Sequence, residues 1–290
     1  MCQSGHEVQH PSPDTSRAVS DVNITLMQRT VSTSIDLSLS GPVRLIYSVA
    51  VAQGNPISSE TLEITVDGSA VEPTEIIDAH GTRLHSVFAT GANASLRYEA
   101  VVDGVADEAP VTDTDDIVYL RPSRYCESDS LAPTAASEFA GLSGLNLLNA
   151  VIDWVNHKLT YVTGSSLPTD GAVRTLLARQ GVCRDFAHLS VALLRSLNVP
   201  ARLAAVYAPG LSPMEFHAVA EALVDGQWWV VDATELAPRQ SLLRVATGRD
   251  AADTAFLTNF GAATTLTGLE VTAVVDDFQL DNTDLLTQLR

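Results

Sequence analysis

Three residue types that together perform thiol chemistry occur in one stretch of this chain, between residues 181 and 234. Cys183 lies near its start, His217 follows within Glu-Phe-His-Ala-Val-Ala-Glu, and Asp232 lies within Gln-Trp-Trp-Val-Val-Asp-Ala-Thr. The reactive form of cysteine is the thiolate, and a histidine oriented by a carboxylate can generate it. Such a set forms a thioester with an acyl substrate and then releases the acyl group to water or to an amine. We therefore treat these three residues as the candidate catalytic site.

The cysteine is predicted to lie at the N-terminus of a helix. Apolar residues recur with helical spacing after Gly181, and the pattern ends at Asn198 and Pro200. Unpaired backbone N–H groups at a helix start favour a thiolate. That effect shifts a pKa by about one unit or less, whereas histidine-paired catalytic thiols fall from about 8.5 to about 3 to 4. A histidine must therefore supply most of the stabilisation.

The histidine and the aspartate are predicted to share one face of a β-hairpin. The runs 216–224 and 227–233 are strand-like, and the Asp-Gly pair between them is a strong hairpin signal. A two-residue turn sets Asp232 opposite Val219, and side chains alternate along a strand. His217 is then a diagonal neighbour of Asp232, about 7 to 8 Å away at the backbone. An imidazole and a carboxylate span that distance, which leaves the other ring nitrogen for the thiol.

These motifs resemble the bacterial transglutaminase-like superfamily. Gly-Val-Cys-Arg-Asp-Phe-Ala-His-Leu, Phe-His-Ala-Val-Ala-Glu and Trp-Trp-Val-Val-Asp-Ala-Thr carry the resemblance, which covers residues 140–275 best. It implies a papain-like α+β core with Cys183 as nucleophile, His217 as general base and acid, and Asp232 as the orienting carboxylate. The family usually has Asp-Pro-Thr where this chain has Asp-Ala-Thr, a departure that concerns only the local turn.

The resemblance and the three residues imply acyl transfer through a thioester. We expect a cysteine peptidase or amidase that acts on peptide or protein amide bonds. The alternatives are a cross-linking transglutaminase, in which an amine replaces water, and a binding or assembly protein with a remnant site. The backbone N–H of Cys183 is one natural oxyanion donor, and Tyr161 and Gln180 are both candidates for the second.

The composition of the chain limits which cellular compartment and which classes of partner we expect. The chain has 290 residues, a formal net charge of −18 and 46% hydrophobic residues, so an acidic surface around a substantial core is expected. The negative charge argues against nucleic acid or an anionic membrane as partner. The three cysteines form neither a disulfide framework nor a metal motif, and no apolar leader or membrane span is visible. We therefore expect a cytoplasmic protein without metal or cofactor; its oligomeric state stays open.

The pattern of residues along the chain predicts two folded units. Residues 1–20 are expected to form a flexible leader, and short alternating runs separated by turns predict an all-β sandwich over 21–122. A junction over 123–140 would connect it to a catalytic unit over 141–290. The expected fold class is therefore α+β, with a papain-like or transglutaminase-like core preceded by a β-sandwich.

Overall fold

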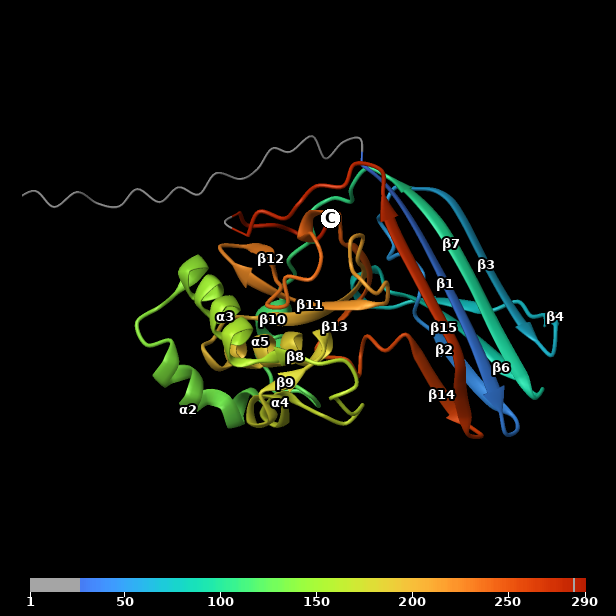
Figure 1. The fold of residues 1–290 in the computed structure, drawn as a ribbon, viewed down its shortest axis with the longest axis horizontal. Coiled ribbons are helices and arrows are strands. Elements are labelled where there is room, and N and C mark those ends of the chain that lie inside the picture. Colours follow the sequence, from blue (N-terminus) through green and yellow to red (C-terminus); the bar gives the residue numbers. More distant parts are fainter. Residues whose placement is uncertain (1–26, 284) are drawn as a thin grey trace, which may run out of the picture.

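The computed structural model describes residues 27–283 and 285–290, so the expected leader over 1–20 lies outside the described residues. Two packed sheets form one end of the molecule, a third sheet lies in the middle, and helices form the other end (Figure 1). This arrangement is the α+β fold with a β-sandwich that the sequence predicts.

The sandwich consists of a five-stranded and a four-stranded antiparallel sheet. In spatial order the first contains β15 (Thr264–Val275), β1 (Gln28–Leu39), β7 (Asn93–Asp103), β3 (Ile57–Val66) and β4 (Ser69–Ala70). The second contains β14 (Leu257–Gly261), β2 (Val43–Tyr47), β6 (Arg83–Ala89) and β5 (Thr74–Ile77), and the 3-10 turn η2 (Ala79–Gly81) precedes β6. Alternate residues of the long strands are buried, as expected for sheets with one face in a core.

Strands from both ends of the chain build this sandwich. β15 pairs with β1 along its length, and β14 pairs with β2. Residues 257–275, which the sequence assigns to the catalytic unit over 141–290, therefore lie in the sheets of the N-terminal unit. The physical reason is that β7 pairs with only one edge of β1, and β6 with only one edge of β2. β15 supplies hydrogen bonds to the other edge of β1, and β14 does the same for β2.

The third sheet carries the hairpin predicted from the sequence. Its strands, in spatial order, are β12 (Gln227–Val231), β11 (His217–Val224), β10 (Ala201–Tyr207) and β13 (Leu243–Gly248), with η3 (Arg239–Ser241) before β13. Val224 pairs with Gln227 across the Asp-Gly turn, and Asp225 and Gly226 both have positive φ. The predicted register of this hairpin is therefore confirmed.

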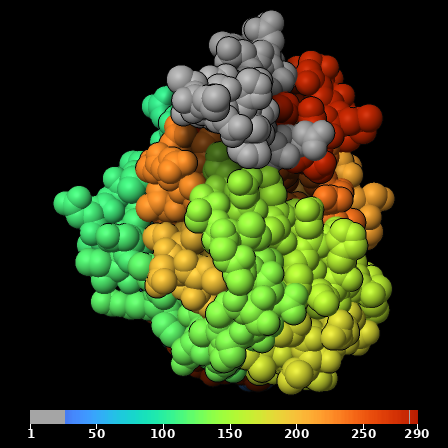
Figure 2. Space-filling model, turned by 90° about the vertical axis from the view of Figure 1, so that its left-hand side faces the viewer, coloured from blue at the N-terminus to red at the C-terminus, as the bar shows by residue number. Residues whose placement is uncertain are grey.

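Helices pack on one side of this sheet, and Figure 2 shows that the green and yellow segments form most of the surface at that end. They are α2 (Ser128–Glu138), α3 (Gly144–Lys158), α4 (Ala172–Ala178) and α5 (Cys183–Ser196), and a short parallel pair joins β8 (Thr160–Tyr161) to β9 (Gln180–Gly181). The short helix α1 (Asp115–Val118) precedes Tyr119, whose ring packs against Trp228 of β12. α5 is almost entirely buried and contacts α2, α3, α4, β10 and β11. The helix that carries the cysteine is thus the centre of the second core.

A polar network and a continuous core join the two units. Tyr207 of β10 is buried in the core of the sandwich, and its hydroxyl contacts Thr33 Oγ1 at 2.6 Å and Val49 O at 2.8 Å. The junction is also packed: Cys126 is fully buried, which raises the pKa of its thiol. No helix in the described ranges is long and apolar enough to cross a membrane.

Candidate active site

The nucleophile candidate lies on the first turn of α5. Cys183 is the first residue of this helix and is partly exposed. Asp185 caps the same end, because its carboxylate accepts a hydrogen bond from Val182 N at 2.8 Å. The thiol therefore lies at a helix N-terminus, where backbone N–H groups have no partner within the helix, as the sequence predicts.

Gly181 allows this helix start to form. A Cβ at position 181 would lie 2.6 Å from Cβ of Asp185, closer than real carbon atoms approach. Asp185 is 1% exposed and also accepts a hydrogen bond from Ser166 Oγ at 2.9 Å. Arg184 fixes the same loop by donating to Leu167 O at 2.8 Å. The cap, the glycine and the loop thus hold the turn that presents Cys183.

His217 begins β11 and lies between a carboxylate and the thiol. Its Nε2 is 3.3 Å from Asp232 Oδ2, and the histidine and aspartate side chains are 0% and 2% exposed. Because Asp232 approaches Nε2, Nδ1 is the nitrogen left for Cys183. Nδ1 is buried and makes no hydrogen bond of regular geometry with a described protein group. Such loose contacts are common in enzymes without substrate.

The electrostatics of the pair favour the imidazolium. Burial alone would lower the pKa of His217, but interactions with Asp232 and Cys183 raise it to about 10. Burial alone would likewise raise the pKa of Asp232, but its hydrogen bonds with His217 and Thr234 and the charge of the imidazolium hold it below the usual value. The site therefore stabilises a charged histidine beside the sulfur.

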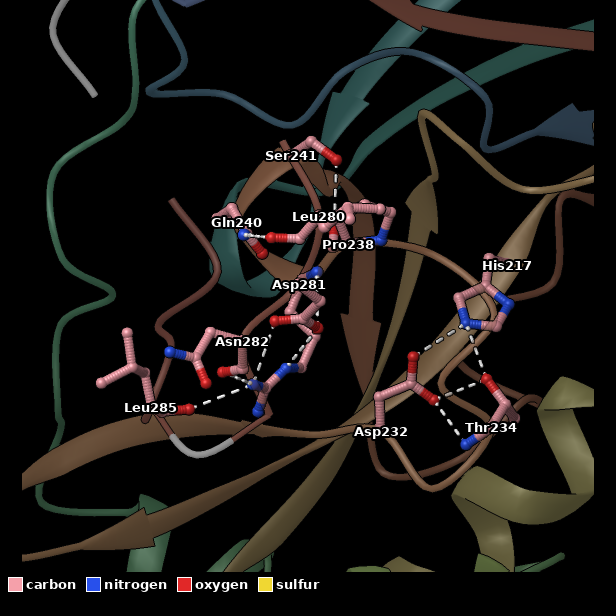
Figure 3. A network of polar contacts seen from close by, with 11 residues as sticks. His217, Asp232, Thr234, Pro238, Gln240, Ser241, Leu280, Asp281, Asn282 and Leu285 are labelled. Atoms are coloured by element: carbon pink, nitrogen blue, oxygen red, sulfur yellow. Dashed lines mark hydrogen bonds and ion pairs between the residues drawn. The ribbon is translucent and has the colours of Figure 1, made fainter. Parts of the chain in front are cut away.

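Thr234 contacts both His217 and Asp232, and the sequence analysis assigned it no role. Its backbone N–H and hydroxyl both donate to Asp232 Oδ1, at 2.9 and 2.7 Å, and its Oγ1 is 3.5 Å from Nε2 of His217 (Figure 3). Asn156 of α3 supports the turn by donating to Ala233 O at 3.0 Å. The Asp-x-Thr spacing was the available signal, because short polar side chains bind backbone two residues away in such turns.

On its far side, Asp232 faces a polar cavity. Figure 3 shows His217 and Thr234 on one side of the carboxylate and a network around Asp281 on the other. The cavity is about 140 Å³ and is lined by Arg239 and Asp281, whose side chains form an ion pair at 2.8 Å. Asp281 and Thr283, from the C-terminal segment, thus line the cavity on the far side of the Asp232 carboxylate.

The two candidates for the second oxyanion donor differ in position. β8 and β9 pair Tyr161 with Gly181, two residues before the cysteine. Burial and the neighbouring Cys183 raise the pKa of Tyr161, and its ring packs 6.0 Å from that of Phe186. Gln180 is exposed and pairs with Thr160, so alternation directs it to the other face of this short ribbon. The phenol, rather than the amide, lies beside the thiol.

His188, on the other side of α5, has a structural role. It is fully buried, stacks on Tyr125 at 5.3 Å, and accepts a hydrogen bond from Ala251 N at 3.1 Å through Nε2. Burial lowers its pKa to about 3, so it stays neutral. Among the described residues, no group of three or more His, Cys, Asp or Glu residues could hold a metal ion.

Comparisons with known proteins identify the family of this chain. A sequence model of the transglutaminase-like superfamily matches residues 136–233, a range that contains Cys183, His217 and Asp232. The crystal structure of a candidate cysteine protease from Cytophaga hutchinsonii is 33% identical, with a TM-score of 0.81; the match covers 91% of this chain and 96% of that one. The chain belongs to the transglutaminase-like superfamily.

A second relative extends the similarity at the level of sequence. The uncharacterized protein ML0607 of Mycobacterium leprae is 26% identical over 222 residues, which are 72% of each chain. The Cytophaga match covers nearly the full length of both chains, so it includes the sandwich as well as the core. The family resemblance and the fold class expected from the sequence are therefore confirmed. Cys183, His217 and Asp232 all lie within the range that the superfamily model matches.

Proposed function

We propose that this protein is a cysteine hydrolase of peptide or related amide bonds. Cys183 is the nucleophile, His217 the general acid and base, and Asp232 the orienting carboxylate. The observation that carries the proposal is the buried imidazole between the thiol and the carboxylate, with its pKa raised to about 10. The name of the Cytophaga relative, a candidate cysteine protease, supports hydrolysis of peptide bonds as the reaction.

The reaction begins with a thiolate and an imidazolium. The Cys183 sulfur attacks the amide carbonyl carbon, and the C–N bond breaks as Nδ1 of His217 gives its proton to the departing amine. The acyl group is then held as a thioester. A water molecule loses a proton to the neutral imidazole and attacks this thioester. The C–S bond breaks, the acid is released, and the thiolate and the imidazolium are restored. Asp232 keeps the ring in one orientation and compensates its charge throughout.

The developing oxyanion requires preorganised donors. The backbone N–H of Cys183 is the first, since it has no partner within the helix. We assign the second to the Tyr161 hydroxyl, because that residue lies beside Cys183, whereas Gln180 lies on the other face. The raised pKa of Tyr161 keeps the phenol protonated and able to donate at neutral pH.

Fluorogenic peptide and amide libraries test this function directly. The wild type should cleave at least one class of substrate, and Cys183→Ala should lose cleavage while Cys126→Ala, at a buried thiol, retains it. A fluorescent primary amine added to the same reactions distinguishes hydrolysis from cross-linking. Incorporation of the amine into protein glutamine, lost in Cys183→Ala, would replace hydrolysis with transfer as the function.

Thiol reactivity provides a second test that needs no substrate. At pH 6 iodoacetamide should alkylate Cys183 faster than Cys2 or Cys126, because an imidazolium lies beside the Cys183 sulfur and favours its thiolate. His217→Ala should reduce that rate by at least about tenfold, since a free thiol with a pKa of about 8.5 is mostly protonated at this pH. Equal rates for Cys183 and Cys2 would exclude an activated nucleophile.

A further inference from the structure

An exposed carboxylate precedes the strand that carries the proposed catalytic histidine. Glu215 is two residues before His217 and is exposed to solvent. Phe216, between them, packs against Tyr207 and Phe256 and so points toward the core of the sandwich. Because side chains alternate along a strand and its direct extension, Glu215 projects to the same side as His217. That is the side on which the imidazole meets the thiol.

The charge of Glu215 acts on the hydroxyl that lies beside the nucleophile. The pKa of Tyr161 is raised by burial, by Cys183 and then by the negative charge of Glu215. Such an interaction weakens with distance and is screened beyond about 10 Å in salt, so the carboxylate lies close to the phenol. Cys183 and Glu215 therefore both face the Tyr161 hydroxyl, although they come from different elements of the fold.

Within the described part of the chain, Glu215 has neither an ion pair nor a hydrogen bond. The cation next to the nucleophile is already engaged, because Arg184 Nη2 donates to Leu167 O at 2.8 Å and lies 3.5 Å from the carboxylate of Asp185. Asp185 thus compensates the charge of Arg184. An exposed negative charge without a counter-ion, in a chain with a net charge of −18, favours a cationic ligand.

The segments around the nucleophile also expose apolar side chains. Val162 directly follows β8, Leu167 lies in the loop that is bonded to the first turn of α5, and Met214 precedes Glu215; all three are exposed. Arginine and lysine side chains combine an apolar stem of three or four methylene groups with a terminal charge. A small cation would interact only with the carboxylate, whereas such a side chain also covers apolar surface.

We propose that Glu215 selects substrates with an arginine or lysine side chain next to the scissile amide. The carboxylate binds the charged end of that side chain, and its methylene groups cover exposed apolar surface, which helps to hold the amide carbonyl at the Cys183 sulfur. The cationic side chain is not a reactant, because the bond that breaks is the neighbouring amide. This inference rests on the proposed hydrolysis and adds the substrate class to it.

Charged thiol reagents test the role of Glu215 without a substrate. Methanethiosulfonates that carry a trimethylammonium, a hydroxyl or a sulfonate group form a mixed disulfide with a thiolate and release methanesulfinate. Cys2→Ser protein is used so that Cys183 is the thiol modified, since Cys126 is fully buried. The ratio of the cationic to the neutral rate should fall at least about threefold in Glu215→Gln, and the ratio for the anionic reagent should rise.

Glu99→Gln is the matched control for this change of charge. Glu99 is exposed on β7 of the sandwich, and its substitution alters the net charge of the chain by the same amount. The control should keep the wild-type ratios, and circular dichroism checks the fold of both variants. Ratios that are the same in Glu215→Gln and in the wild type, or that change equally in the control, would overturn the role of Glu215.

Matched peptides test the selectivity of hydrolysis. Acetylated fluorogenic peptides carry arginine, citrulline or glutamate at each of the two positions that flank the scissile amide, and citrulline keeps the shape of arginine without its charge. At one position arginine should give a kcat/KM at least about tenfold above citrulline, mainly through KM, because a charge-assisted hydrogen bond is lost. Glu215→Gln should reduce that preference to within about twofold, since its side chain carries no charge.

The outcomes separate this inference from the proposed function. If no amide is cleaved but the reagent ratios still change in Glu215→Gln, hydrolysis is wrong and the cation-binding role of Glu215 stands. If arginine and citrulline peptides are cleaved equally well, hydrolysis stands and the specificity is refuted. Peptides without arginine but with a free amino terminus form the last arm, and an equal preference for them would refute selection of a side chain.

Discussion

Replacing Asp232 by Asn removes the charge that holds His217 as an imidazolium. The substitution keeps the shape of the side chain, and the two groups are 3.3 Å apart with almost no exposure to solvent. Breaking a buried ion pair by removing one partner costs about 3 to 5 kcal/mol. At about 1.4 kcal/mol per pKa unit, the pKa of His217 should fall by about 2 to 4 units, from about 10 to about 6 to 8.

The sign of the effect on activity follows from the raised pKa. In the wild type the imidazolium persists as pH rises and is lost near pH 10. In Asp232→Asn the same loss should occur at a pH lower by about 2 to 4 units, so the alkaline limb of activity moves toward neutrality. The stability contribution of His217 behaves in the same way: it is complete below about pH 6.5 and is lost as pH rises through about 10.

The assay is kcat/KM between pH 5 and 11 on a substrate found with the peptide and amide libraries, because the departing amine takes its proton from the imidazolium. This profile should show the shifted alkaline limb. Asp281→Asn is the matched control, because Asp281 lines the cavity on the far side of Asp232 and pairs with Arg239 instead of the imidazole. An alkaline limb that moves by less than about half a unit in Asp232→Asn, or equally in the control, would refute this reasoning.

Two further substitutions test the surroundings of the nucleophile. Tyr161→Phe should lower kcat/KM by about 10²-fold. The alkylation rate of Cys183 should change little, because an oxyanion donor acts on the substrate and not on the thiol. Unchanged turnover would exclude Tyr161 as the donor. Gly181→Ala should lower the free energy of unfolding by about 1 to 3 kcal/mol in urea titration, because the new Cβ would lie 2.6 Å from Asp185. Gly41→Ala, whose Cβ would lie at an ordinary 3.4 Å from its nearest neighbour, should have a much smaller effect.

Local signals explain why the helix and the hairpin could be predicted. The helical spacing after Gly181 predicts α5, which extends over Cys183–Ser196. The Asp-Gly turn fixes the register of β11 and β12, and with it the side of the hairpin on which His217 and Asp232 meet. These features depend on residues close together in the sequence, so periodicity and turn chemistry suffice.

Long-range pairing could not be predicted in the same way. β14 and β15 join the sandwich because the edges of β2 and β1 need partners, and that need depends on strands near the opposite end of the chain. The helix α2 was also absent from the prediction, since Pro133 lies inside it and its sequence is rich in small and polar residues. Burial on α5 stabilises α2 despite this weak local preference.

The pairing of β14 with the sandwich brings Phe256 against the residue that precedes His217. Phe216, the preceding residue, packs between Tyr207 and Phe256, with ring centroids 5.4 and 5.6 Å apart. Tyr207 is bonded to the sandwich, and Phe256 directly precedes β14. The backbone at the start of β11 is therefore fixed by aromatic side chains that belong to both units. Because a displacement of about 1 Å at a catalytic group can cost about 10²-fold in rate, the sandwich is part of what positions the imidazole against the thiol.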